Sequence, residues 1–205
     1  MCARPANPEL RSEILKAATR IVEGCGPDCV TMREVAQEVG YSSTTLYNHF
    51  KDKDDILREV MLEGFDALTD FCLSARVGPS NVDKLRQSAR AYVTWGVLHP
   101  SLYQLMLESR LDVVWTPEEV DRLTRLFPET ARDIGAAISA GEMKRVDDTS
   151  RVTTAMRATM HGVTSLTISR RLRVELMGLG TAELLAVATS LGDELMQDVL
   201  APLLV

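Results

Sequence analysis

The chain has 205 residues, 45% of them hydrophobic and 25% charged, a composition that excludes a disordered or fibrous protein and allows a small module on a larger body. No apolar run approaches the ~18 residues of a membrane span and the N-terminus lacks a signal-peptide core, so we expect a cytoplasmic protein without membrane contact. The formal net charge of −6 excludes a generally basic nucleic-acid binder, and any DNA-binding surface must therefore depend on local geometry.

The spacing of apolar residues, three and four positions apart along most of the chain, predicts an all-α fold. A first helix is expected from Pro8 to Glu23, with glycines after it. Thr31 and Glu34 have the spacing of a capping box, in which the threonine hydroxyl accepts from the Glu34 amide and the Glu34 side chain reaches the Thr31 amide. The second helix that starts there ends at Gly40, since glycine readily adopts the left-handed turn conformation.

A short third helix follows this turn, capped by Ser42 and reaching Phe50. Leu46 and Phe50 are its inward residues, whereas its outer face is small and polar. Hydrogen-bonding side chains crowd this helix: Ser42, Ser43, Thr44, Thr45, Tyr47, Asn48 and His49. Two short helices joined by a sharp turn are typical of a helix-turn-helix. An ordinary helical hairpin is the alternative, but it gives no reason for the polar crowding, which favours a nucleic-acid face.

The remaining chain reads as a helical body joined to this module by a long helix. Asp52 caps this fourth helix, which continues toward Leu73. Further helix starts are marked at Ser80, Pro100, Thr116, Asp147 or Asp148, and Thr181, and Pro128 should kink or divide one helix. We therefore expect about nine helices, with a three-helix module in residues 1–55 and the body in residues 56–205.

The cysteines, Cys2, Cys25, Cys29 and Cys72, form no disulfide framework for a chain of this length, and we expect thiols. Cys25 and Cys29 also have the spacing of a metal-binding or redox pair, but no second Cys or His pair lies nearby, so turn packing is the simpler interpretation. We expect no metal and no cofactor. Scattered histidines without a phosphate loop or nucleophile motif also argue against an enzyme.

The sequence TMREVAQEVGYS from Thr31 to Ser42, followed by TLYNHFKDKDDIL from Thr45 to Leu57, resembles the TetR family of repressors. The resemblance is strong over about residues 10–60 and elsewhere extends only to helix order. It implies a homodimer whose N-terminal modules enter successive major grooves of a near-palindromic double-stranded DNA operator. It also implies that residues 56–205 bind an effector and dimerise, so that a small, mainly apolar molecule releases the operator. A DNA-binding regulator without a small effector, controlled by a protein partner or by abundance, remains an alternative.

The resemblance also implies roles for individual residues. Thr31, Tyr47, His49 and Lys53 match positions that usually hold phosphates, and Ser43, Thr44 and Asn48 match positions that read bases. The expected DNA-binding residues are Thr31, Arg33, Ser42, Ser43, Thr44, Thr45, Tyr47, Asn48, His49 and Lys53. Helix N-termini offer amides to phosphates, and local positive charge comes from Arg4, Arg11, Arg33, Lys51 and Lys53. His49 also fits a packed or helix-capping histidine.

In the body, large side chains with apolar area and a few polar groups are candidates for an effector pocket, although core packing explains most of them equally well. They are Tyr92, Trp95, His99, Tyr103, Met106, Trp115, Phe127, Met160 and His161. Trp95, Tyr103 and His161 are the better candidates because each joins apolar area to a polar tip.

The final helix is apolar around much of its circumference and therefore needs two partners. A dimer interface shared with the preceding helix supplies the second partner, and a fully buried core helix is the alternative. The expected interface residues are Ala155, Val163, Leu166, Leu184, Ala188, Leu191, Leu195 and Val199.

Overall fold

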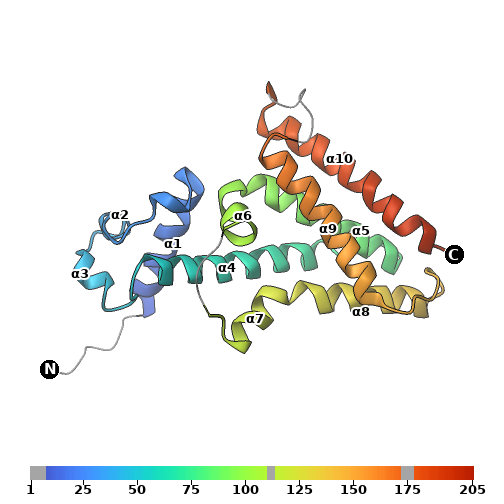
Figure 1. The fold of residues 1–205 in the computed structure, drawn as a ribbon, viewed down its shortest axis with the longest axis horizontal. Helices are drawn as coiled ribbons and strands as arrows, with labels where there is room; N and C mark the ends of the chain where they lie inside the picture. The colour runs from blue at the N-terminus through green and yellow to red at the C-terminus, as the bar shows by residue number, and fades with distance from the viewer. Residues whose placement is uncertain (1–7, 110–113, 172–177) are drawn as a thin grey trace. The chain divides into compact units, whose positions relative to one another are not determined.

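A computed structural model describes residues 8–109, 114–171 and 178–205 (Figure 1). Ten α-helices and short 3-10 turns make up the regular structure, and the described ranges contain no strand, which confirms the all-α class. The helices are α1 (Pro8–Cys25), α2 (Met32–Glu38), α3 (Ser43–Leu46), α4 (Lys53–Ser74), α5 (Asn81–Leu98), α6 (Pro100–Leu107), α7 (Pro117–Thr124), α8 (Leu126–Ser139), α9 (Thr149–Ile168) and α10 (Thr181–Leu200), with turns η1 (Pro27–Cys29) and η3 (Ala201–Leu203).

The chain forms two compact units that are not contiguous in sequence. Unit 1 comprises Met1–Phe65 and His99–Glu119, and unit 2 comprises Asp66–Leu98 and Val120–Val205. Helix α6 belongs to unit 1 because it packs against α1. These structural units therefore differ from the expected division at residue 55, which stays a prediction about where DNA and effector bind.

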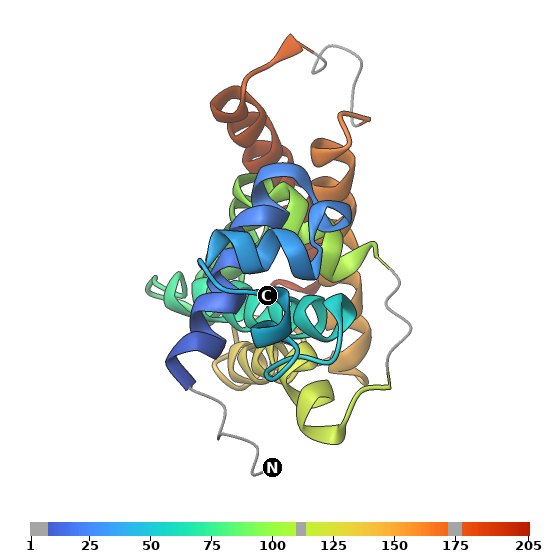
Figure 2. The same ribbon diagram turned by 90° about the vertical axis from the view of Figure 1, so that its left-hand side faces the viewer.

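In unit 1, α1, α2 and α3 lie together and bury one apolar face each (Figures 1 and 2). Ile14, Val35 and Leu46, one from each helix, are completely buried. Thr31 and Ser42 cap α2 and α3 by accepting hydrogen bonds from the amides three residues later, at 3.1 and 3.2 Å. The expected helix starts are therefore present, and the helices are held by a shared apolar core.

The turn between α2 and α3 depends on Gly40, whose φ of 73° lies in the left-handed region. This conformation lets the Tyr41 amide donate back to the Ala36 carbonyl at 2.9 Å. Helix α3 is shorter than expected, because beyond Leu46 the chain tightens into turns in which the His49 amide donates to the Leu46 carbonyl at 2.8 Å.

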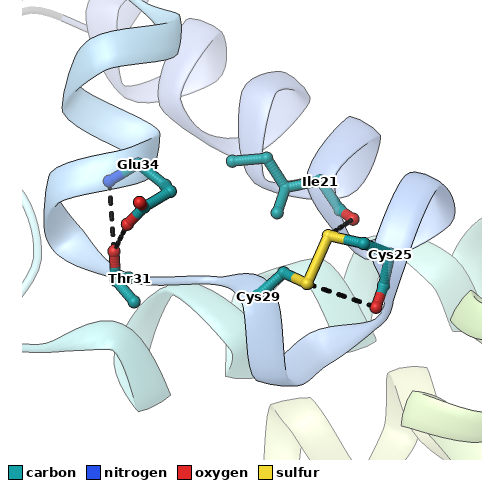
Figure 3. The surroundings of a disulfide bond; sticks show 5 residues. All are labelled: Ile21, Cys25, Cys29, Thr31 and Glu34. Carbon is teal, nitrogen blue, oxygen red and sulfur yellow. Dashed lines mark hydrogen bonds between the residues drawn. A yellow bond between two sulfur atoms is a disulfide. The ribbon is translucent and has the colours of Figure 1, made fainter.

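Cys25 and Cys29, the last residues of α1 and η1, are joined as a disulfide (Figure 3). This corrects the expectation that both remain thiols packed in a turn. The bridge closes the bend between α1 and the segment that leads to Thr31. Cys72 is a free cysteine, and its burial raises the pKa of the thiol to about 12.

A close approach of α4 and α6 within unit 1 occurs at Gly64. A Cβ at this position would lie 2.6 Å from the Met106 sulfur and 3.3 Å from Leu102. A larger residue there would push the side chains of α6 aside, so Gly64 permits the contact.

Unit 2 is built on α5, which packs against α8, α9 and α10. The expected division at Pro128 is present, since α7 ends at Thr124 and α8 begins at Leu126. Pro128 thus lies in the first turn of α8, where the missing amide is tolerated.

Ion pairs tie the unit 2 half of α4 to the last turn of α7 and to Arg125, which stands between α7 and α8. Arg122 binds Asp66 at 2.6 Å, and Arg125 binds Asp70. Arg125 directly precedes α8, so the position of this helix start is connected to α4.

Candidate nucleic-acid interface and internal cavity

The residues expected to contact DNA lie on the surface of α2, α3 and the following turn. Exposed residues are Thr31, Arg33, Ser42, Thr44, Tyr47, Asn48 and Lys53, while Ser43, Thr45 and His49 are half-buried. Tyr47 is 57% exposed. Packing within the chain therefore does not account for this large aromatic side chain, which remains available to a partner.

The opposite side of α3 is anchored in the core. Leu46 is completely buried and Phe50 is 2% exposed. The Arg11 guanidinium lies 4.7 Å from the centroid of the Phe50 ring and pairs with Glu59 at 2.9 Å. Arg11, expected to add positive charge to the DNA-binding surface, is thus engaged in holding α1, α4 and the end of the α3 turn together.

Thr31 is bound to Glu34 in two ways (Figure 3). Its hydroxyl oxygen accepts from the Glu34 amide, and the hydroxyl donates to the Glu34 carboxylate in place of the expected bond between that carboxylate and the Thr31 amide. The hydrogen bond from Thr31 is the main reason that the pKa of Glu34 lies below its ordinary value. A phosphate that binds the Thr31 hydroxyl has to replace this carboxylate.

His49 is partly packed. Its Nδ1 is buried and has no hydrogen-bond partner among the described residues. The buried Nδ1 fits the packed histidine of the two alternatives, and the contact with a phosphate stays a prediction.

Positive charge at this surface is local. Arg33, Lys51 and Lys53 form no ion pair with any residue that the structure describes, whereas Arg20 is occupied by Glu38 at 3.0 Å. Arg4 lies outside the described residues. A few cations next to polar side chains suit a DNA backbone without making the acidic protein generally basic.

Unit 2 contains a small cavity between α5, α8 and α9, with a volume of about 50 Å³. Each helix turns one face toward it. The lining consists of Leu85, Ser88, Ala89, Tyr92, Leu126, Phe127, Thr130, Thr153, Met156, Arg157 and Met160. An apolar lining with a few polar groups is the usual composition of a small-molecule site.

The comparisons with known proteins place both parts of the chain in one family. The profile of bacterial regulatory proteins of the tetR family matches residues 14–60, and that of the tetracyclin repressor-like C-terminal domain matches residues 85–189. The chain belongs to the TetR family. The first profile covers α2, α3 and the turn between them, so the candidate nucleic-acid interface lies in the part of the chain that matches bacterial regulatory proteins.

Individual TetR-family relatives are distant. The chain is 24% identical over 150 residues to the HTH-type transcriptional regulator Rv1816 of Mycobacterium tuberculosis, covering 71% of this chain and 64% of that protein. It is 34% identical over 65 residues to the HTH-type transcriptional repressor KstR2 of Mycolicibacterium smegmatis, covering 31% of this chain and 32% of that protein. The chain thus spans less than two thirds of the length of these relatives.

Solved structures share the fold of this TetR-family chain. A protein of unknown function from Rhodococcus sp. RHA1 superposes with a TM-score of 0.75 at 24% identity, covering 93% of this chain and 96% of that one. A TetR family transcription regulator from Marinobacter aquaeolei VT8 gives a TM-score of 0.63 at 19% identity, covering 90% of this chain and 93% of that one.

No described helix has the length and apolar character needed to cross a membrane.

The expected effector residues of this TetR-family chain are divided between the two units. Tyr92, Phe127 and Met160 line the cavity. Trp95 is buried and His161 half-buried elsewhere in unit 2. The other four belong to unit 1, namely His99, Tyr103, Met106 and Trp115.

These four have evident partners or burial within unit 1. His99 Nδ1 lies 2.7 Å from a Glu23 carboxylate oxygen, and Tyr103 is completely buried. Trp115 lies beneath the Arg58 guanidinium, 5.4 Å from the ring centroid. Their apolar area and few polar groups suggested a pocket; the structure shows packing and pairing contacts for them within unit 1, and a role in effector binding stays a prediction.

The expected dimer residues also separate into two groups. Val163, Leu184 and Ala188 are buried inside unit 2, so their burial requires no second chain. Ala155, Leu166, Leu191, Leu195 and Val199 keep exposed surface. On α10, the partly exposed residues 187, 191, 195 and 199 recur every four positions beside the buried row 184, 188, 192 and 196. This helix therefore has one row in the core and a second, apolar row that stays partly exposed.

Sequence reasoning missed most of the cavity lining. Ser88, Ala89, Thr153, Met156 and Arg157 lie on helices that are distant in sequence and meet only in the folded unit. The one available signal was the spacing of three and four on α5 and α9, which marks an inward face but not which helix it meets.

Proposed function

We propose that this TetR-family regulator is a homodimeric repressor that binds a near-palindromic DNA operator and leaves it when a small molecule binds in unit 2. The observation that carries the proposal is the two-sided segment formed by α3 and the turns that follow it. Leu46 and Phe50 are fixed in the core, while Thr44, Tyr47 and Asn48 are exposed beside unpaired cations. An anchored helix with an outward row of hydrogen-bonding groups suits insertion into a major groove.

Within this proposal, two groups of residues act differently. Tyr47, His49 and Lys53 hold phosphates and set the register of the protein on the duplex, while Ser43, Thr44 and Asn48 contact base edges. Their exposure supports these roles.

The proposed dimer is supported by the partly exposed row Leu191, Leu195 and Val199 on α10, together with Ala155 and Leu166 on α9. Apolar rows on two adjacent helices, facing their symmetry mates, form a four-helix interface. A dimer also matches a two-fold operator, with half-sites about one helical turn or a small multiple apart.

Release by an effector is supported by the cavity and by the ion pairs of α4. A molecule that displaces Phe127 acts next to Arg125, which is bound to Asp70 on α4. Helix α4 begins directly after the DNA-binding module. A coupling of about 1–3 kcal/mol would reduce operator affinity roughly 5- to 150-fold.

A second candidate is regulation without a small effector, through a protein partner or abundance. The volume of about 50 Å³ favours it, because pockets for drug-sized ligands usually exceed about 300 Å³. The two candidates make the same DNA-binding prediction and differ only in whether a compound releases the operator.

In vitro selection of duplexes bound by the purified full chain tests the proposal. We expect enrichment of a near-palindrome, binding of two chains per duplex in sedimentation, and loss of binding in Tyr47→Ala. Recovery of no common sequence would contradict specific binding. The selected duplex is then used to screen compounds for release, and failure of all compounds would favour the second candidate.

A further inference from the structure

The cavity adjoins a second hollow, and three side chains line both. A surface groove of about 280 Å³ is lined by Phe127, Pro128, Ala131, Ser150, Thr153, Thr154 and Arg157. Phe127, Thr153 and Arg157 also line the internal cavity. Movement of the Phe127 ring would therefore join the two spaces into one site large enough for a small organic ligand.

Arg157 stands at this boundary. Its guanidinium lies 4.3 Å from the centroid of the Phe127 ring. The side chain is exposed, forms no ion pair with any described residue, and is the one charged group in either lining. Any ligand that occupies both spaces thus meets a single cation at the mouth and no carboxylate that would neutralise it.

Ser88 is the corresponding polar group inside. It is 8% exposed and lines the cavity, and its hydroxyl has no hydrogen bond to the part of the chain that the structure describes. The neighbouring hydroxyls differ, since Thr130 donates to the Leu126 carbonyl and Thr153 to the Thr149 carbonyl. The Ser88 hydroxyl is therefore available to a ligand that enters the cavity.

We propose that the effector site takes a small amphipathic monocarboxylate, with its apolar body between α5, α8 and α9 and its carboxylate on Arg157. This rests on the proposed effector-binding role. Guanidinium groups bind carboxylates through paired, charge-assisted hydrogen bonds. Leu85, Ala89, Met156 and Met160 provide the apolar surface for the body, and the two methionines can adjust to its shape.

A monoanion is favoured over a phosphate ester because one guanidinium, with no second cation in the lining, balances a single negative charge. When a carboxylate binds Arg157, the Phe127 ring can still contact the guanidinium or the first carbons of the ligand. The ligand class thus follows from one cation and a mainly apolar wall that carries a few hydroxyl groups.

Isothermal titration calorimetry of the full chain without DNA tests this with straight-chain carboxylates from butanoate to dodecanoate and with phenylacetate. Octanol, octylammonium and octyl phosphate are the comparison compounds for octanoate. We expect saturable binding of at least one carboxylate, and weaker binding of the alcohol, amine and phosphate of matched length. Arg157→Gln should weaken that carboxylate about 10- to 100-fold, while Arg157→Lys restores part of the affinity.

Arg151→Gln, which removes an exposed charge from the same helix outside both linings, is the control and should bind the carboxylate normally. Ser88→Ala should weaken only those ligands that reach the cavity floor. The proposal is overturned if no carboxylate in the series binds, if the matched alcohol or phosphate binds as tightly, or if Arg157→Gln binds unchanged. The calorimetry contains no DNA, so it tests ligand binding separately from operator release. If a carboxylate binds the chain but does not release the operator, only the proposed release mechanism is rejected.

Discussion

The hydroxyl of Thr31 donates to the carboxylate of Glu34, which stands three residues along the chain on α2. This contact places a negative charge beside a residue proposed to hold a DNA phosphate. Glu34→Gln keeps an acceptor for the hydroxyl but removes the charge. We therefore expect its affinity for the selected operator to rise about twofold or more at low salt, and the gain to shrink as salt is added.

Fluorescence anisotropy at several salt concentrations measures this effect. Glu38→Gln is the matched control, since Glu38 is an exposed carboxylate on the same helix that is paired with Arg20 instead. Equal gains in both variants would assign the effect to net charge alone.

Thr31→Ala should weaken operator binding and lower the free energy of unfolding by about 1 kcal/mol through loss of the helix cap.

Tyr47 and Asn48 should affect binding in different ways although they are adjacent and both exposed. Tyr47→Ala should weaken binding to every duplex, since a phosphate contact carries no sequence information. Asn48→Ala should lose about 1–3 kcal/mol on the operator and change the preferred base at one position. Titration against all single base-pair variants of the operator distinguishes the two, and a uniform loss in both variants would contradict base reading by Asn48.

Charge on the outer row of α10 should break the proposed dimer. Leu191→Glu and Leu195→Glu place a carboxylate among apolar side chains, so we expect a folded monomer in sedimentation at micromolar concentration. Ala186→Glu adds the same charge to an exposed position of α10 outside that row and should remain dimeric. A dimeric Leu195→Glu protein with an unchanged sedimentation coefficient would move the interface elsewhere.

The Cys25–Cys29 bridge should stabilise unit 1 modestly because it closes a very short loop. In the chain-entropy account, replacing both cysteines by serine costs about 2 kcal/mol of unfolding free energy. Alkylation followed by peptide mapping should label both cysteines only after reduction. Cys72 is an internal control, since its buried thiol with a raised pKa should stay unlabelled until the protein unfolds.

Asp148 should contribute stability that depends on pH. It caps α9, and hydrogen bonds from the Ser150 side chain and amide lower the pKa of its carboxyl below the ordinary 3.8. A carboxyl with a depressed folded-state pKa stabilises the protein above its unfolded-state pKa, and this contribution is lost as pH falls through the folded value. The urea midpoint of Asp148→Asn should therefore lie below that of the parent at pH 6 and converge toward it below about pH 3.8. Asp147→Asn, which replaces a neighbouring exposed carboxyl that does not cap α9, is the control and should keep the midpoint of the parent at pH 6.

The DNA-binding module was predictable because its signals are local. The Thr31 and Ser42 caps, the stop at Gly40 and the inward residues Leu46 and Phe50 all act within a few residues of the chain. Two details still differed. The Glu34 carboxylate accepts from the Thr31 hydroxyl, and α3 tightens after Leu46, since such choices depend on small energy differences between competing hydrogen bonds.

The cavity was not predictable because it depends on which helices meet. Trp95 and Tyr103 have the chemistry of ligand contacts, yet they are 5% and 0% exposed and lie outside the cavity lining. Arg157, with ordinary surface chemistry in the sequence, lies at the mouth. Whether a residue lines the cavity depends on which distant parts of the chain pack against it, and not on its residue type alone.

The ion pair between Arg125 and Asp70 concerns the response of the protein to its effector, and not the binding of operator or effector. Neither residue lies on the DNA-facing surface or in the cavity lining, but Arg125 joins the start of α8, next to Phe127, to α4. Alleles that lose Asp70 would keep the chemistry for operator and effector alike while weakening the link between α8 and α4, where the contacts of Arg122 and Arg125 with Asp66 would remain. In the proposed repressor, inducibility can therefore be lost by mutation at sites that touch neither ligand, and non-inducible alleles need not identify the effector pocket.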